Sequence, residues 1–553
     1  MSRYCAFSGE IVAQCREVGR WKRDWGETGL SSLIQGRTLE AVDGVVFLAL
    51  SDTDGRAQLP DGSKVHHVLK DISRSDAQRL REFLAEAGYS DENLRKQGLY
   101  TELPSAKLRN AARLRDLVSE PTLLNRLLRW FWLGMPQEAE GPGGLIPSWF
   151  TEIALSCGLL RQEGTSLVAT VMLFPSKQFL TACDPAVRID ARDPEFVLWP
   201  NPTTKLLYHF TVRRPSRASL DLGTGNAVQA MAASLHSDHV VATDLNERAV
   251  GYAKFSARLN GVENVECLAG DGFAPVEGRT FDLITSNPPF FISPSDHYLF
   301  CDNPMDLDGL CRRFVKEAPA YLNEDGYFQM LCEWAQIKGQ PWTERISEWL
   351  DGTGCDAWVL MGNTQDAADY AQHRIADLAG TPERDAELYE TYMAYYKARN
   401  VEGIHDGVIA MRKRSGKNWV LLEETPEVPN VPFGDFILAS FEARDFLNAH
   451  QADEQMLTVK PRLSPHARLE QFFEPGEGRW KPTTLNLRLK KGLPFFIGLQ
   501  AEVAGFLSGC DGSRTIGEMI EKFAPQVDAP FEKVQAECLG IMRRLLERGF
   551  LLF

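Results

Sequence analysis

An apolar run that ends in two consecutive prolines is the most informative local feature of this sequence. The run "FDLITS" has the composition of a buried strand, and Asn287, Pro288, Pro289 and Phe290 follow it directly. Because proline cannot donate to a strand ladder, two in succession end the strand and leave Asn287 at its end. The side-chain oxygen of Asn287 and the carbonyl of Pro288 are both hydrogen-bond acceptors on a stiff backbone.

A glycine-containing turn follows another apolar run, in "SLDLGTGNA". The run ends in Asp221, and Gly223 and Gly225 permit a tight turn before a helix that Asn226 can cap. Glycines let a ligand approach the backbone, and a helix N-terminus favours negative charge. Alone, this turn indicates only a nucleotide site of the Rossmann-like kind.

Two further acidic residues end apolar runs at informative distances. In "VVATDLN", Asp244 stands 244 − 221 = 23 residues after Asp221, where an acidic side chain can accept from both hydroxyls of a ribose. In "AGDGF", Asp271 could accept from an adenine amino group. Parallel strands place their C-terminal ends at one edge, where open α/β sheets bind ligands, so we expect these residues and Asn287 to gather there.

The elements that must position these residues lie between about 195 and 425, where apolar runs alternate with helical patterns. We predict strands at "ASLDLG", "HVVATDL", "VECLAGD", "FDLITSN", "GYFQMLCEW" and "AWVLMGN", and an antiparallel pair at "GVIAMRKR" and "WVLLEE". This alternation predicts an α/β fold with a parallel sheet that helices cover on both faces.

The set of motifs resembles the class I S-adenosylmethionine-dependent methyltransferases. Within them, DLGTG together with NPPF is similar to the small-domain group that methylates planar nitrogens: release-factor glutamine, adenine-N6 and rRNA guanine-N2 methyltransferases. The resemblance covers roughly 195 to 335 and implies a Rossmann-like sheet with S-adenosylmethionine as the cofactor. Ala227 departs from the pattern, because these enzymes often keep a further glycine there.

The resemblance also implies roles for individual residues. It implies that the first turn binds the methionine end of the cofactor, that Asp244 binds the ribose, and that Asp271 with Gly272 or Phe273 binds the adenine. The cofactor set that it implies is Asp221, Gly223, Thr224, Gly225, Asp244, Leu245, Asp271, Gly272, Phe273 and Asn287. The implied catalytic set is Asn287, Pro288, Pro289 and Phe290, and no metal is needed.

For such an enzyme, the NPPF motif has a physical explanation. The lone pair of an amide or exocyclic amine is delocalised, so its nitrogen is a poor nucleophile. If Asn287 and Pro288 both accept from the NH₂ group, they aim the lone pair and favour the charge that grows in the transition state. Phe290, with Phe291, would offer a flat apolar face for stacking. Related enzymes fold a strap over the cofactor where this chain has Trp199, Pro200, Asn201 and Thr203, although a helix start capped by threonine would look the same.

We predict five segments along the chain. They are a poorly specified extension (1–75), a helical, winged-helix-like domain (76–192), the S-adenosylmethionine-binding methyltransferase domain (193–425), an irregular basic linker (426–490) and a helical, winged-helix-like C-terminal domain (491–553). Residues 457 to 491 hold eight Lys or Arg against three Glu, and a solvated linker with a basic bias explains them most simply.

Composition limits the classes of function. A net charge of −15 argues against broad binding to nucleic acid, although it leaves room for a local basic patch. The eleven scattered cysteines, the lack of a long apolar run and the lack of a signal-peptide pattern lead us to expect a cytoplasmic protein without membrane contact. The acceptor would be a macromolecule, protein glutamine or a nucleobase in RNA or DNA. The alternatives are a small-molecule methyltransferase and a winged-helix DNA-binding protein that senses the cofactor without catalysis.

Overall fold

The computed structural model describes residues 69–99, 113–138, 144–185, 193–295, 297–376, 381–425 and 431–553 of the 553-residue chain. These residues form two compact units, the first built from residues up to 202 with 251–261 and 295–302, and the second from the rest. Most of the predicted extension, 1–68, lies outside the described residues. Within the described ranges, no helix has the length and apolar character that a membrane span requires.

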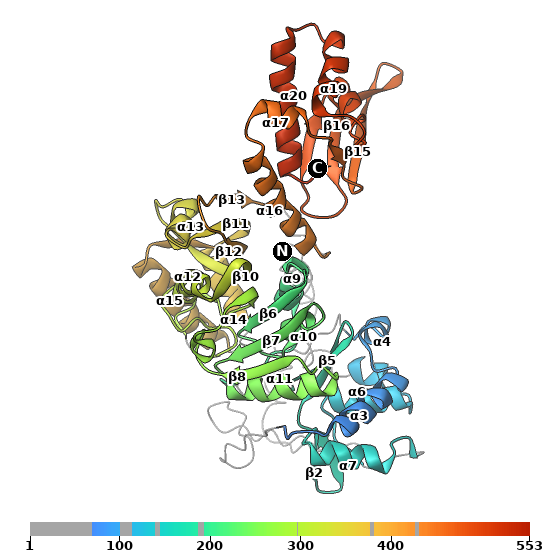
Figure 1. Ribbon diagram of the computed structural model, residues 1–553. Helices are drawn as coiled ribbons and strands as arrows, with labels where there is room; N and C mark the ends of the chain where they lie inside the picture. Colours follow the sequence, from blue (N-terminus) through green and yellow to red (C-terminus); the bar gives the residue numbers. More distant parts are fainter. Residues whose placement is uncertain are drawn as a thin grey trace, which may run out of the picture. The chain divides into compact units, whose positions relative to one another are not determined.

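An eight-stranded sheet organises the second unit, in the order β13-β11-β12-β10-β9-β6-β7-β8 (Figure 1). Its strands are β6 (Ser216–Leu222), β7 (Ser237–Asp244), β8 (Val265–Ala269), β9 (Phe281–Ser286), β10 (Leu322–Ile337), β11 (Cys355–Asp366), β12 (Val401–Lys413) and β13 (Val420–Glu424). β6 lies between β7 and β9, so the strand order reverses at β6, and ligands bind at such a point in open α/β sheets. The Rossmann-like α/β class predicted from the sequence is confirmed.

The helices of this region connect the strands. They are α9 (Pro202–Phe210), α10 (Val228–Ala233), α11 (Glu247–Leu259), α12 (Gly309–Glu317), α13 (Trp342–Leu350), α14 (Ala367–Ala376) and α15 (Pro382–Ala398), with 3₁₀ turns η5 (Ala274–Val276) and η6 (Ala318–Tyr321). A large apolar core joins side chains from β6, β9, β10, β11 and β12 to those of α12 and α13. This burial fixes the strand ends that hold the candidate site.

The sheet is mixed rather than purely parallel. β12 runs antiparallel to both β10 and β11, whereas β13 pairs in parallel with β11. The predicted pairing of "GVIAMRKR" with "WVLLEE" is therefore wrong, because β11 lies between them. The reason is the route of the chain: α14 and α15 follow the C-terminal end of β11, so β12 starts at that edge and runs back.

β10 is much longer than its neighbour β9. The parallel pairing stops at Met330 opposite Ser286, and β10 then continues to Ile337 while it remains paired with β12. A second apolar cluster joins this continuation to α14 and α15, and it includes Ile292 from the loop after β9. The sheet thus extends past the point where the Asn-Pro-Pro-Phe segment begins.

The first unit contains helices and two small sheets. The helices are α3 (Arg74–Glu86), α4 (Asp91–Lys96), α6 (Leu123–Phe131) and α7 (Ser148–Ser156); the strands are β1 (Gln137–Glu138), β2 (Leu160–Glu163), β3 (Ser166–Ala169), β4 (Met172–Ser176) and β5 (Phe179–Cys183). They form a sheet of order β1-β3-β2 and the hairpin β4-β5. The assignment of 76–192 to a winged-helix-like class stays a prediction.

The C-terminal module begins well before residue 491. Its elements are α16 (Gly434–Ala449), α17 (Asp453–Leu457), β14 (Arg462–Leu463), β15 (Ala467–Gly476), β16 (Arg479–Leu489), β17 (Phe496–Leu499), α18 (Ala501–Leu507), α19 (Ile516–Phe523), η7 (Ala524–Gln526), α20 (Phe531–Glu547) and β18 (Leu551–Leu552). The described part of 426–490 is therefore not an irregular linker. Met456, Val459, Leu487 and Leu489 are buried in the same core as the helices after 501, which explains why this segment is folded.

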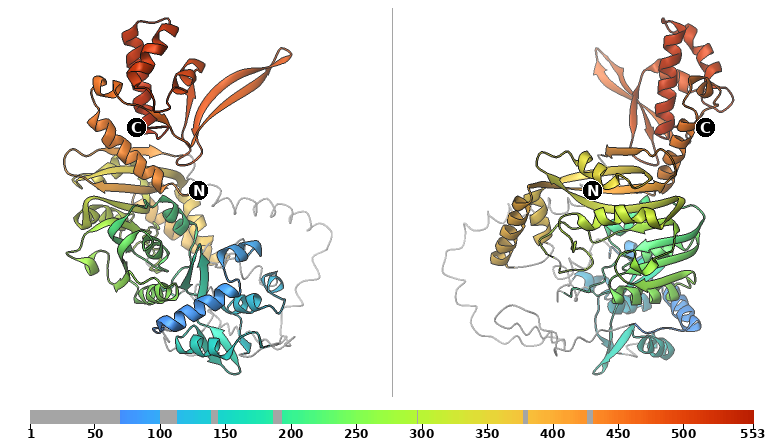
Figure 2. Two further views of the ribbon diagram at one scale, coloured as in Figure 1. Left: turned by 45° about the vertical axis from the view of Figure 1, so that its right-hand side comes forward. Right: turned by 60° about the vertical axis from the view of Figure 1, so that its left-hand side comes forward.

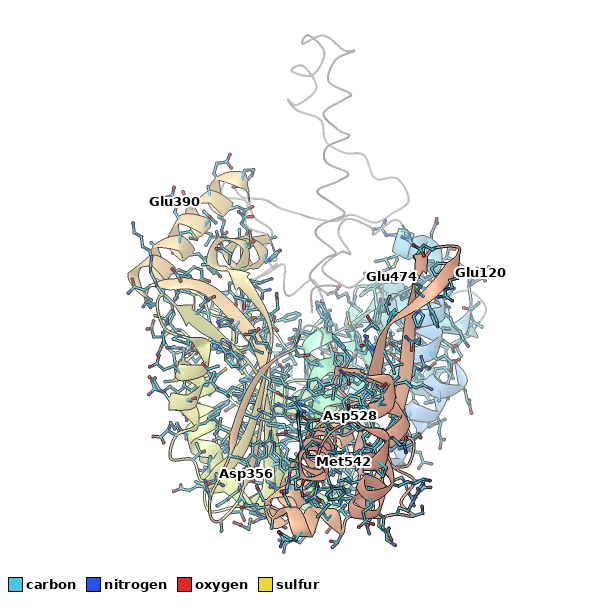
Figure 3. All side chains as sticks on the ribbon, turned by 90° about the horizontal axis from the view of Figure 1, so that it is seen from above. Glu120, Asp356, Glu390, Glu474, Asp528 and Met542 are labelled. Atoms are coloured by element: carbon cyan, nitrogen blue, oxygen red, sulfur yellow. The ribbon has the colours of Figure 1, made fainter. Side chains whose placement is uncertain are left out.

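The hairpin β15–β16 projects from this module (Figure 2). Its outer half is exposed on both faces, and Glu474 lies near its free end (Figure 3). Phe473 and Trp480 are 53 % and 68 % exposed. Several of the basic residues counted between 457 and 491 lie on this ribbon, including Arg479 and Lys481.

Candidate cofactor and acceptor site

The turn after β6 is organised by the side chain of Asp221. Its Oδ2 accepts from the Thr224 hydroxyl at 2.7 Å and from the Ala230 N–H at 3.0 Å, which ties the turn to α10. Burial raises the pKa of Asp221 to about 6, against the opposing effect of these hydrogen bonds. The side chains of Asp221 and Thr224 therefore fix the conformation of the turn by hydrogen bonds inside it.

The two glycines of this turn leave their backbone open. Gly223 and Gly225 have φ of 76° and 52°, and a Cβ added to either would meet nothing within 4 Å. Ala227, at the start of α10, has φ of 65°, a left-handed conformation that is unfavourable for alanine. The family's frequent glycine at this position matches that backbone geometry.

Asp244 ends β7 next to this turn. Its Oδ2 accepts from the Gly225 N–H at 2.8 Å, and its Oδ1 accepts from the Asn246 N–H at 2.9 Å. Burial raises the pKa of Asp244, which nevertheless keeps a partly exposed side chain. Leu245 follows with 56 % of its surface exposed. The carboxylate and an open apolar side chain thus stand side by side at the strand end.

The third predicted strand end differs in part from expectation. Asp271 is exposed and forms an ion pair with Arg313 of α12 at 2.9 Å, and Gly272 follows it in a left-handed turn. Phe273 is 1 % exposed, and its ring stacks on Tyr321 at 4.5 Å between centroids. The Phe273 ring is therefore part of the main core beside this strand end, and its contact with the adenine stays a prediction.

Asn287 is held in a defined orientation. Its Nδ2 donates to the Thr203 hydroxyl at 3.2 Å, and its Oδ1 is buried without a hydrogen-bond partner. A buried acceptor without a partner is destabilised by roughly 1–3 kcal/mol, which an incoming donor recovers. Thr203 belongs to the stretch in which a strap over the cofactor was one of two predictions, and here it lies at the start of α9.

The two residues after the prolines have unequal surroundings. Phe290 is 9 % exposed and belongs to the main core, so packing holds its ring in place. Phe291 packs edge-on against it at 5.5 Å and carries the guanidinium of Arg374 on one face at 3.8 Å. The stacking role of Phe290 stays a prediction.

Helices α14 and α15 reach the same loop, which the sequence did not reveal. Tyr370 and Tyr396 contact the backbone of Ile292 through their hydroxyl groups. The tyrosine-rich stretch "ELYETYMAYY" of α15 was a signal that this helix buries polar aromatic side chains, whereas Tyr370 of α14 lies outside that stretch. Nothing in the sequence indicates which backbone groups they meet.

Family models match two parts of the chain. Residues 201–341 match the model described as Methyltransferase small domain, and residues 439–553 match a Domain of unknown function (DUF7782). Residues 201–341 are therefore a class I S-adenosylmethionine-dependent methyltransferase domain of the small-domain type. The second match agrees with the module that begins before residue 491.

Curated relatives point to the same class. The chain is 32 % identical over 164 residues to the release factor glutamine methyltransferase of Xylella fastidiosa, covering 27 % of this chain and 60 % of the relative. It is 33 % identical over 176 residues to that of Yersinia pestis, covering 29 % and 61 %. The chain thus spans about three fifths of the length of these relatives.

Solved structures resemble the chain more remotely. A methyltransferase from Pyrococcus furiosus has 17 % sequence identity and a TM-score of 0.24, covering 38 % of this chain and 82 % of that one. The assignment rests on the family model and on the sheet order.

The residues at the strand ends fit S-adenosylmethionine. The open backbone at Gly223 and Gly225 admits a ligand, and a side chain there would fill that space. Asp244 presents a partly exposed carboxylate, and Asn287 has an acceptor without a partner.

Proposed function

We propose that the protein is an S-adenosylmethionine-dependent N-methyltransferase whose acceptor is the side-chain amide of a glutamine in a protein. The observation that carries this proposal is the orientation of Asn287, whose Nδ2 is bonded to Thr203 while Oδ1 has no partner. The similarity to enzymes named for release factor glutamine methylation supports a protein acceptor over a nucleobase.

In this proposal the first turn and Asp244 hold the cofactor. The open backbone at Gly223 and Gly225 takes the amino-acid end, and the carboxylate of Asp244 accepts from ribose hydroxyls. Leu245 covers one side of the adenine, and Asp271 with Gly272 lies near its amino group, where Arg313 competes for the carboxylate. When bound, S-adenosylmethionine supplies an electrophilic methyl group.

The acceptor nitrogen is activated by placement. Asn287 Oδ1 and the Pro288 carbonyl accept hydrogen bonds from the two N–H groups of the amide, which aligns its lone pair with the methyl group. The nitrogen would bond to the methyl carbon as the bond from that carbon to sulfur breaks, and one of the two nitrogen protons would leave after the transfer. The adjacent Pro289 restrains the carbonyl of Pro288, so it needs little reorganisation during the reaction. Because Oδ1 is shielded from water in this conformation, the acceptor must displace the groups that cover it.

The test is transfer of labelled methyl from S-adenosylmethionine into extract of cells that lack this protein. Wild type, Asn287→Ala and the control Asn418→Ala are compared, with cofactor affinity measured by calorimetry. Asn418 is a suitable control because its amide donates to the Arg414 carbonyl in the loop between β12 and β13. We expect label that protease releases, on a glutamine, at a rate about 100-fold lower in Asn287→Ala, with cofactor affinity unchanged.

Other results would redirect or reject the proposal. Label released by nuclease would make the acceptor a nucleobase, and the flanking modules would then select nucleic acid. Binding of the cofactor without labelled macromolecule would contradict the proposal and favour a small-molecule enzyme or a sensor. Equal rates of methyl transfer for wild type and Asn287→Ala would show that the Asn287 side chain takes no part in the reaction.

A further inference from the structure

Two tyrosine hydroxyl groups hold the backbone of Ile292, which lies in the same loop as Asn287. The Ile292 N–H donates to the Tyr370 hydroxyl oxygen at 3.3 Å, and the Ile292 carbonyl accepts from the Tyr396 hydroxyl at 2.7 Å. Ile292 is fully buried among the side chains of α14 and α15. Both polar groups of one loop residue are thus bonded to a separate pair of helices.

The tyrosines belong to a part of the fold that the methyltransferase family model does not cover. The match ends at residue 341, whereas α14 and α15 span residues 367–376 and 382–398. These helices pack on the continuation of β10 and β12 past the end of β9. The loop after Asn287 is therefore supported by helices that lie outside the family match.

Tyr370 is itself fixed from the other side. Its hydroxyl donates to Glu333 on the continuation of β10, so its single proton is used there and a lone pair faces the Ile292 N–H. One turn along α14, Arg374 packs on the ring of Phe291 at 3.8 Å. Two successive loop residues are consequently held by one helix.

The opposite end of the loop is also restrained, because Thr203 bonds the Asn287 amide. Between these ends, Pro288 and Pro289 have fixed φ angles and few accessible conformations. A stiff segment fixed at Asn287 and at Ile292 has little freedom to rotate. The position of the Asn287 oxygen and of the Pro288 carbonyl is thereby coupled to the tyrosines.

We propose that Tyr370 and Tyr396 are positioning residues. By holding Ile292, they place the Asn287 side-chain oxygen and the Pro288 carbonyl so that both can hydrogen-bond the nitrogen that receives the methyl group and align it for transfer. This inference rests on the proposed function, since only transfer to nitrogen makes that placement matter for the rate. It assigns to α14 and α15 an effect on kcat that is distinct from cofactor binding.

The experiment compares Tyr370→Phe and Tyr396→Phe with the control Tyr392→Phe. Tyr392 is buried in the same cluster and packs edge-on against Tyr396, while the two polar groups of Ile292 are bonded to the other tyrosines. Three quantities are measured on the full chain: hydrogen exchange of the peptide containing Ile292, affinity for S-adenosylmethionine, and kcat and KM for the labelled acceptor.

We expect exchange of the Ile292 amide to rise about tenfold in Tyr370→Phe and not in the control. We expect kcat to fall 10- to 100-fold in both test variants, with cofactor affinity within twofold of wild type. Unchanged exchange would overturn the proposal, as would equal losses of kcat and cofactor affinity in all three variants. If wild type transfers no methyl group, the proposed function is wrong, and so is the role of the two tyrosines in transfer. The hydrogen exchange of the Ile292 amide is a separate result, which shows whether the tyrosines hold the loop.

Discussion

Thr203 and Asn287 are joined by a hydrogen bond of 3.2 Å from the Asn287 Nδ2 to the Thr203 hydroxyl oxygen, across 84 positions of sequence. The bond uses the donor side of the amide and leaves the acceptor side, Oδ1, without a partner. The Oδ1 atom can only accept, so a ligand NH₂ group can satisfy it and a carbonyl oxygen cannot.

Thr203→Val removes this hydroxyl while it preserves the shape of the side chain. The Asn287 amide then loses its orienting bond, and we expect methyl transfer to fall about tenfold with unchanged affinity for S-adenosylmethionine. Thr203→Ser keeps the hydroxyl and is expected to retain most of the rate. Equal rates for Thr203→Val and wild type would show that the amide is oriented by other contacts.

Asp244→Ala is expected to weaken binding of S-adenosylmethionine about 10- to 100-fold, because bonds from ribose hydroxyls to a carboxylate are lost. Calorimetry measures the effect. The matched control is Asp238→Ala, at the exposed N-terminal end of the same strand β7. If both variants bind the cofactor equally well, the ribose does not lie at Asp244.

Ala227→Gly should stabilise the protein, since Ala227 has the left-handed φ of 65° that costs a non-glycine residue about 1 kcal/mol or more. Loss of one buried methyl group offsets part of the gain, so we expect the free energy of unfolding to rise by about 0.5–1 kcal/mol. Ala230→Gly, in the interior of α10, should lower it by about 1 kcal/mol. A lower thermal midpoint for Ala227→Gly than for wild type would show that the backbone at Ala227 is not strained.

His405 on β12 should make the protein sensitive to acid. Burial lowers its pKa to about 4, and its Nε2 is buried without a hydrogen-bond partner. Because the unfolded chain binds this proton more readily, the stability contributed by neutral His405 is present above about pH 6.5 and is lost as the pH falls towards 4.

Between pH 7.5 and pH 5, we expect the free energy of unfolding of His405→Gln to fall by about 2 kcal/mol less than that of wild type. Urea unfolding at the two pH values measures this difference. Tryptophan fluorescence is a suitable probe, since the Trp334 and His405 rings lie 5.7 Å apart. Parallel losses in the two proteins would show that His405 titrates normally in the folded state.

The four polar strand ends could be predicted because each apolar run stops at a glycine, a proline or an acidic residue. That local signal located Asp221, Asp244 and Asn287 at one edge of the sheet, and the strand order confirms the edge. The burial of Phe273 and Phe290 could not be predicted, because the direction of a ring depends on which core closes around it.

Contacts distant in sequence also escaped prediction. The two hydrogen bonds of Ile292, one donated to Tyr370 and one accepted from Tyr396, span 78 and 104 positions of sequence, and no spacing rule predicts them. The hairpin β15–β16 was predicted to be irregular because most of its residues are exposed on both faces, so the one-sided apolar alternation of a half-buried strand is missing.

The continuation of β10 determines where a shorter fragment of this chain can end without exposing a long sheet edge. The family match ends at residue 341, so a fragment with that boundary would keep the 16-residue β10 but lose β12, its outer neighbour. Its long, largely apolar edge would then offer unpaired N–H and C=O groups to other copies, which promotes aggregation. A soluble catalytic fragment of this chain must therefore extend through β13, to at least Glu424.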